Sequence, residues 1–138
     1  MKYKNKKLTF EKVGVQNIAK KYSTPTYCYS YNQLEVNIKS FKKSFESFSP
    51  LICFAVKSNT NLNLIKEIKK FGLGADVVSI GELMMALKAG INPKKIVFSG
   101  VGKTSNEISY AIDKKILLIN AESQSEINEI DRLARIKK

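Results

Sequence analysis

Four short apolar segments, each followed by a helix-like segment, constrain the fold of this chain more than any other feature. The apolar segments begin at residues 51, 75, 96 and 116, so the unit recurs every 20 to 24 residues. Strands and helices that alternate at this spacing predict a parallel sheet covered by helices, because parallel neighbours need a long crossover. We expect the strands at 51–56, 75–78, 96–98 and 116–119.

The regular pattern begins after residue 30. Before it, the sequence predicts strands at 8–10 and 26–30 around a helix at 15–21. We therefore expect an N-terminal segment, 1–30, followed by an α/β unit, 31–138. Three helices of this unit begin with a polar residue and a glutamate three positions later, the spacing of a capping box. The pairs are Asn32 with Glu35, Thr104 with Glu107, and Ser123 with Glu126.

Two α/β architectures fit the repeat: an open doubly wound sheet and a (β/α)8 barrel. No Gly-x-Gly-x-x-Gly follows the first strand, which weakens a nucleotide-binding open sheet. Residues 99–104 end in Gly-Lys-Thr, but a phosphate loop also requires glycine where this chain has Val97. We interpret 99–104 as a tight turn with Thr104 capping the next helix. A complete barrel needs about 250 residues, so four units correspond to half of one.

Composition excludes several kinds of chemistry. The chain has no histidine, which excludes histidine metal sites and Ser–His or Cys–His nucleophiles within it. Cys28 and Cys53 lie in apolar surroundings, so we expect buried free thiols. No apolar run approaches the roughly 20 residues of a membrane span, and no signal peptide is evident. We expect a cytoplasmic protein without a membrane partner.

The net charge of +12 could indicate a nucleic-acid partner. Only Arg132 and Arg135 can form the planar fork that suits phosphates, however, and the lysines are scattered along the chain. A solvated lysine-rich surface explains the charge better, and we expect no nucleic-acid partner.

Lys57 is the first candidate for chemistry, in the stretch FAVKSN at 54–59. It lies where the first strand of the repeat ends, and functional groups gather at that edge in parallel α/β proteins. A desolvated lysine amine can attack a carbonyl and form a Schiff base. A lysine that simply reaches solvent explains the position equally well.

Asp76 and Glu82 flank the end of the second strand. An unpaired carboxylate inside an apolar strand is costly, so Asp76 needs a partner, and Lys57 or a cationic cofactor nitrogen would serve. Structural pairing is an equal alternative. Glu82, near a helix N-terminus, is favourable with the helix dipole whatever else it does.

Taken in order, several stretches resemble the fold-type III pyridoxal-phosphate-dependent decarboxylases, and most closely the diaminopimelate decarboxylase family. The resemblance covers nearly the whole chain. It implies the first half of an alanine-racemase-like (β/α)8 barrel, preceded by a segment that joins a separate β-domain. The matching stretches are YSTPTYCYS (22–30), CFAVKSN (53–59), GLGADVVSIGEL (72–83), KIVFSGVGKT (95–104) and INAES (119–123).

The resemblance implies that Lys57 holds pyridoxal 5'-phosphate through a Schiff base while meso-2,6-diaminopimelate is decarboxylated to L-lysine. Ala55 would be the small residue that lets the cofactor ring lie close. Asp76 would lie near the cofactor, and Glu82 would support it.

The family's ring-stacking histidine, its glycine-rich phosphate loop and the acidic partner of the ring nitrogen belong to later strands. We therefore expect this chain to be an N-terminal part that is inactive alone. A homodimer, as in the full-length family, or a separate C-terminal half would complete the barrel. Two alternatives stay open: a non-catalytic cofactor-binding or interaction module, and a related decarboxylase of ornithine, arginine or a polyamine precursor.

Overall fold

The computed structural model describes residues 1–137. The chain forms two compact units, Met1–Ser49 and Pro50–Lys138. The boundary after residue 30 that the sequence indicates stays a prediction. No helix among the described residues is both long enough and apolar enough to cross a bilayer.

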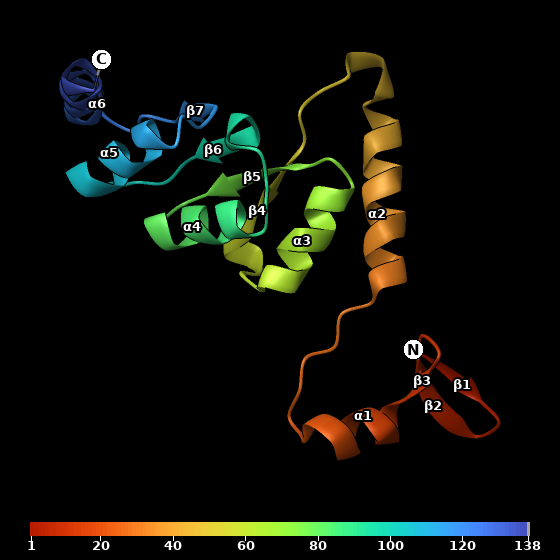
Figure 1. The fold of residues 1–138 in the computed structure, drawn as a ribbon. Coiled ribbons are helices and arrows are strands. Elements are labelled where there is room, and N and C mark those ends of the chain that lie inside the picture. The colour runs from red at the N-terminus through yellow and green to blue at the C-terminus, as the bar shows by residue number, and fades with distance from the viewer. Residues whose placement is uncertain (138) are drawn as a thin grey trace. The chain divides into compact units, whose positions relative to one another are not determined.

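The N-terminal unit contains a small antiparallel sheet with the strand order β1-β2-β3 (Figure 1). The predicted strand at 8–10 and the predicted helix at 15–21 are confirmed to within one residue at either end. The elements of this unit are β1 (Lys2–Lys4), β2 (Lys7–Phe10), β3 (Val13–Gly14), α1 (Val15–Tyr22), α2 (Tyr31–Ser44) and the 3-10 helix η1 (Glu46–Phe48).

The segment 26–30 was expected to be a strand, and that expectation is wrong. No strand among residues 1–137 pairs with these residues, so no hydrogen-bonded ladder forms. Cys28 in this segment is consequently exposed rather than buried, and both cysteines are free thiols.

The cap of α2 also differs from the prediction. Ser30, not Asn32, precedes the helix, and its hydroxyl accepts a hydrogen bond from Gln33 N at 3.0 Å. The Glu11 carboxylate fixes this start from outside the helix. It accepts a short hydrogen bond from the Ser30 hydroxyl and another from Asn32 N at 3.0 Å, and the Ser30 bond lowers the Glu11 pKa. Asn32 lies inside the first turn because Ser30 already occupies the capping position.

The second unit contains a four-stranded parallel sheet, and each of its strands is followed along the chain by a helix (Figure 1). The predicted strand at 96–98 matches β6, and the other three are shorter than or shifted from their predicted bounds. The elements are β4 (Cys53–Ala55), η2 (Val56–Ser58), α3 (Leu62–Lys70), β5 (Gly74–Val77), α4 (Ile80–Lys88), η3 (Pro93–Lys95), β6 (Ile96–Phe98), α5 (Ser105–Asp113), β7 (Leu118–Ile119) and α6 (Gln124–Ile136).

The strand order decides between the two predicted architectures. The order is β4-β5-β6-β7, so each strand pairs in parallel with the one before it and the order never reverses. A doubly wound sheet reverses direction at its switch point, whereas a barrel adds strands in one direction. Helices α3, α4, α5 and α6 contact one another in the same order. The prediction of the first half of a barrel is confirmed.

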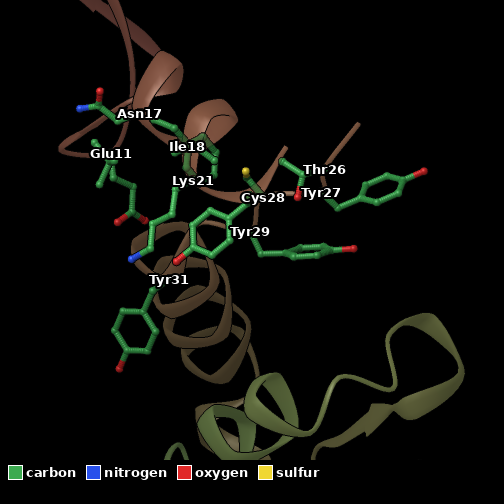
Figure 2. Close-up of a pocket in the computed structure, with 12 residues that line it drawn as sticks. Glu11, Asn17, Ile18, Lys21, Thr26, Tyr27, Cys28, Tyr29 and Tyr31 are labelled. Carbon is green, nitrogen blue, oxygen red and sulfur yellow. The ribbon is translucent and has the colours of Figure 1, made fainter. Parts of the chain in front are cut away.

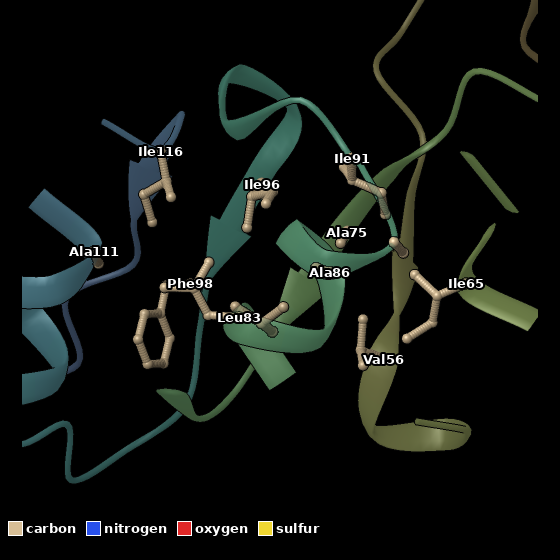
Figure 3. Close-up of a cluster of buried hydrophobic side chains, with 12 residues drawn as sticks. Val56, Ile65, Ala75, Leu83, Ala86, Ile91, Ile96, Phe98, Ala111 and Ile116 are labelled. Carbon is tan, nitrogen blue, oxygen red and sulfur yellow. The ribbon is translucent and has the colours of Figure 1, made fainter. Parts of the chain in front are cut away.

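The register of the sheet separates two faces. Val77 pairs with Phe98 and Ala75 with Ile96, and all four side chains are fully buried. Figure 3 shows Ala75, Ile96 and Phe98 in the core that the sheet forms with the helices. Their sequence neighbours point to the opposite face, because successive side chains of a strand alternate. That second face is only partly covered by residues 1–137, and Leu118 on it is exposed.

One glycine permits the close packing of β4, β5 and the start of β6. A Cβ atom at Gly74 would lie 2.2 Å from Lys95 O and 2.8 Å from Cys53 Sγ. Cys53 itself is half-buried, and burial together with the Asp76 carboxylate raises the pKa of its thiol. The sequence predicted a buried free thiol at Cys53, and the structure shows a free thiol that is half-buried.

Candidate functional site

Lys57 follows the first strand of the sheet by one turn of 3-10 helix. Strand β4 ends at Ala55 instead of continuing to 56, because the chain turns there: Ser58 Oγ donates to Ala55 O at 2.7 Å and Asn59 N to Val56 O at 3.0 Å. Val56 is fully buried, while Lys57 is exposed. The turn η2 contacts β5. An amine accessible to solvent is thus held at the carboxyl edge of the sheet by a buried neighbour.

Ala55 and Asp76 lie side by side on the partly covered face. They are direct partners in the β4–β5 register, so their side chains project to the same side of the sheet. Both are half-buried. The structure therefore places Ala55 and Asp76 beside each other, with Lys57 two residues beyond Ala55 in the turn that contacts β5.

The partner of Asp76 is not the predicted one. Ser99 Oγ donates to Asp76 Oδ1 at 2.6 Å, and no ion pair joins Lys57 to Asp76 anywhere in residues 1–137. Asn120 Nδ2 in turn donates to Ser99 Oγ at 2.9 Å. A chain of two hydrogen bonds therefore runs across the ends of three successive strands.

Ser99 and Asn120 were missed by the sequence analysis, although their positions carry a signal. Each residue directly follows its strand, and each continues the ladder by one bond: Ser99 N donates to Val77 O and Asn120 N to Phe98 O, both at 2.8 Å. This places both side chains two residues beyond the row of Asp76 and on the same face. Polar residues in the first position after consecutive strands are the pattern that could have identified them.

Lys103 lies beside this chain of hydrogen bonds and is engaged within the fold. Its ammonium donates to Gly100 O and Asn120 O at 2.7 Å each and pairs with the Glu126 carboxylate at 3.2 Å. The side chain is 1% exposed and that of Glu126 is 9% exposed. The ammonium thus has no free face for a nucleotide phosphate. The predicted capping box of Thr104 with Glu107 is present and starts α5.

Acidic side chains at the helix starts bond to backbone N–H groups. Glu82 Oε2 accepts from Val78 N at 2.9 Å, and Glu107 accepts from Thr104 N and Ile80 N at 3.0 Å each. The bond from Thr104 N–H is the largest effect that lowers the pKa of Glu107. Within residues 1–137, Glu82 has no hydrogen bond to Asp76, so its supporting role stays a prediction.

A separate pocket lies within the N-terminal unit (Figure 2). Its volume is about 630 Å³. None of the candidate site residues lines it. Its lining residues are Phe10, Glu11, Val13, Asn17, Ile18, Lys21, Tyr22, Thr26, Tyr27, Cys28, Tyr29 and Tyr31.

The arrangement around Lys57 fits a flat cofactor that carries an aldehyde. A lysine amine condenses with an aldehyde, a small residue such as Ala55 leaves room for a ring, and a carboxylate suits a cationic group. Asp76 Oδ1 is taken by Ser99, whereas Oδ2 has no hydrogen-bond partner among residues 1–137. No group of three or more potential metal ligands occurs in the described part of the chain.

Comparison with known proteins gives a consistent result. Residues 31–138 match the family model "Pyridoxal-dependent decarboxylase, pyridoxal binding domain". The chain is 41% identical over 134 residues to a diaminopimelate decarboxylase of Aquifex aeolicus, which covers 97% of this chain and 31% of that protein. It is 45% identical over 114 residues to one of Helicobacter pylori, covering 83% of this chain and 28% of that protein.

Solved structures agree. The crystal structure of diaminopimelate decarboxylase from M. jannaschii in complex with L-lysine superposes with a TM-score of 0.95 at 32% identity, covering 99% of this chain and 33% of that chain. The chain thus spans about a third of the length of the proteins it matches.

Proposed function

Because this chain belongs to the pyridoxal-dependent decarboxylases, we propose that it supplies the lysine anchor for pyridoxal 5'-phosphate in an enzyme that decarboxylates meso-2,6-diaminopimelate to L-lysine. The observation that carries the proposal is the position of Lys57, an exposed amine one turn beyond β4, in a turn that contacts the strand of Asp76.

Each residue has a specific task in this proposal. Lys57 would hold the cofactor, since a lysine amine can condense with an aldehyde. When bound, the cofactor supplies an electron sink for the loss of carbon dioxide. Ala55 leaves space above the sheet for a planar ring. Asp76 keeps one carboxylate oxygen, Oδ2, available on the same face.

The substrate follows from the relatives. The two curated relatives described above carry the name diaminopimelate decarboxylase, and the M. jannaschii enzyme was crystallised with L-lysine, the expected product. Since the chain spans about a third of these proteins, we propose this activity for the whole enzyme to which residues 1–138 correspond. The face of the sheet that carries Ala55 and Asp76 also carries Leu118, which is exposed within the described residues. A cytoplasmic location stays a prediction.

The anchor is tested by reductive trapping. The chain is incubated with pyridoxal 5'-phosphate, reduced with borohydride, digested and mapped by mass spectrometry. We expect the stable adduct to concentrate on Lys57 and to be absent from the Lys57→Arg variant at that position. Lys66, exposed on α3, is the internal reference for unspecific labelling. Label spread evenly over the exposed lysines would overturn the assignment.

The reaction is tested in the same series with a chimera. Residues 1–138 replace the matched first third of the Aquifex aeolicus relative, and carbon dioxide release is measured with diaminopimelate, ornithine and arginine in parallel. We expect release from diaminopimelate, abolished by Lys57→Ala. A folded chimera that binds the cofactor but releases no carbon dioxide would favour the non-catalytic alternative, and preference for ornithine or arginine would overturn the proposed substrate.

A further inference from the structure

We propose that Ser99 and Asn120 are positioning residues that hold the Asp76 carboxylate in the cofactor site, with Lys103 fixing Asn120 from behind. The inference rests on the proposed function, because Asp76 matters here only if the cofactor is anchored at Lys57. It adds three residues that neither strand periodicity nor the family resemblance assigned. The observation that carries it is the unbroken series of contacts from Glu126 through Lys103, Asn120 and Ser99 to Asp76.

The direction of the hydrogen bonds is determined by their chemistry. The amide nitrogen of Asn120 can only donate, so Ser99 Oγ accepts at 2.9 Å. The Ser99 hydroxyl hydrogen is then free to point at Asp76 Oδ1, 2.6 Å away, where a carboxylate can only accept. The relay therefore runs from Asn120 to Ser99 to Asp76, and it presents Asp76 with an oriented donor rather than a rotating one.

Asp76 depends on this donor for its orientation. Within residues 1–137, the hydrogen bond from Ser99 Oγ is the one bond that the Asp76 carboxylate accepts. Ser99 and Asn120 lie two residues beyond the row of Asp76 on the same face, so the donor reaches the carboxylate from the edge of the sheet. A carboxylate held at Oδ1 keeps Oδ2 turned to one place, and an aspartate without that bond can rotate about its side-chain torsions.

Lys103 holds the far end of the relay. Its ammonium binds Asn120 O at 2.7 Å and Gly100 O at 2.7 Å, so one buried cation ties the loop after β6 to the loop after β7. Glu126 balances the charge and also accepts from Glu122 N at 2.7 Å. Burial opposes the ionised form of Glu126, but the bonds from Glu122 N–H and Lys103 lower its pKa overall. Lys103 and Glu126 thus neutralise each other and both make further hydrogen bonds, which a buried ion pair requires.

The test compares variants of the whole chain with pyridoxal 5'-phosphate as the probe. The readout is the yield of borohydride-reduced adduct on Lys57 relative to that on exposed Lys66, with the thermal midpoint measured on the same samples. Ser99→Ala removes the donor to Asp76. Asn120→Asp keeps the size of the side chain, removes the donor to Ser99 and offers the Ser99 hydroxyl a competing acceptor.

We expect both variants to lower the Lys57 preference about tenfold, the scale of one hydrogen bond to a charged group. Ser99→Thr retains the hydroxyl and should restore the preference. The double variant Ser99→Ala with Asn120→Asp should equal Ser99→Ala alone, because Asn120 acts through Ser99. Ser40→Ala and Asn106→Ala, at exposed positions outside the network, are the matched controls and should leave the preference unchanged.

The outcomes separate this inference from the proposed function. If the unaltered chain shows no preference for Lys57, the proposed anchor itself fails. If it labels Lys57 selectively and both relay variants do so equally well, the positioning role is refuted while the anchor stands. If the two substitutions multiply in the double variant, Asn120 does not act through Ser99, which also refutes the relay. A fall in thermal midpoint without a change in labelling would mean that the network stabilises the fold but does not position Asp76.

Discussion

Replacement of Lys103 by methionine should destabilise the second unit far more than the loss of any surface lysine. Methionine has a similar length and no charge, so the substitution removes the cation and leaves the packing volume nearly intact. The Glu126 carboxylate, 9% exposed, would lose its counter-ion, and Gly100 O and Asn120 O would each lose a donor at 2.7 Å.

The magnitude follows from burial. Removing one member of a buried ion pair costs about 3–5 kcal/mol, because the remaining charge stays out of water. A carbonyl left without its partner costs about 1–3 kcal/mol, but these terms overlap with the first and do not add in full. We expect a loss of about 3–5 kcal/mol in the free energy of unfolding, a large fraction of the stability of a small domain.

Urea unfolding followed by far-ultraviolet circular dichroism measures this quantity. Lys66→Met, on the exposed side of α3, is the matched control and should change the stability by less than about 0.5 kcal/mol. Adding Glu126→Gln to Lys103→Met removes the unpaired charge and should recover part of the loss. A Lys103→Met variant within about 1 kcal/mol of the parent would refute the reasoning, since it would mean that the ammonium exchanges its three partners for water at no cost.

Two further predictions follow from the packing and the caps. Gly74→Ala should cost about 1–3 kcal/mol in urea unfolding, because the new methyl group meets the rigid backbone at Lys95 O. Gly81→Ala is the control and should be neutral or slightly stabilising, because the nearest atom lies 3.8 Å away. Equal effects of the two substitutions would contradict the close approach at Gly74. Glu107 has a lowered pKa, so its stabilising contribution is present above its ordinary value of 4.5 and is lost as the pH falls through the folded-state value. The difference in unfolding free energy between the parent and Glu107→Gln should therefore shrink as the unfolding pH is lowered below about 4.5, and a difference independent of pH would contradict the bond from Thr104 N–H.

The elements that were predicted well are those specified by neighbouring residues. Thr104 and Glu107 form their capping box three residues apart, and the strand at 96–98 is bounded by η3 on one side and the turn at Gly100 on the other. Both arrangements depend on residues that are close in sequence, so the sequence alone predicts them. The prediction of a strand at 26–30 was wrong for the opposite reason. A strand forms only when a neighbouring strand pairs with it, and no pattern within those five residues shows whether such a partner exists.

The candidate site shows the same division. The position of Lys57 just beyond a strand end follows from the repeat, whereas the pairing of Ala55 with Asp76 depends on the β4–β5 register. The choice of Ser99 rather than Lys57 as the partner of Asp76 depends on the β5–β6 register and on a hydroxyl 23 residues away. Register is a property of the folded sheet, so hydrophobic periodicity could indicate that Asp76 needs a partner without identifying it.

The glutamates at the starts of α4, α5 and α6 give the carboxyl edge of the sheet an electrostatic polarity. Glu82 and Glu126 accept from the N–H groups of Val78 and Glu122, which lie just before the capping residues of α4 and α6. Glu107 accepts from the N–H group of Thr104, the capping residue of α5. Glu82 and Glu107 thereby place negative charge beside the positive ends of α4 and α5, whereas the charge of Glu126 is balanced by Lys103. The fold thus secures the loops after β5, β6 and β7 with its own carboxylates.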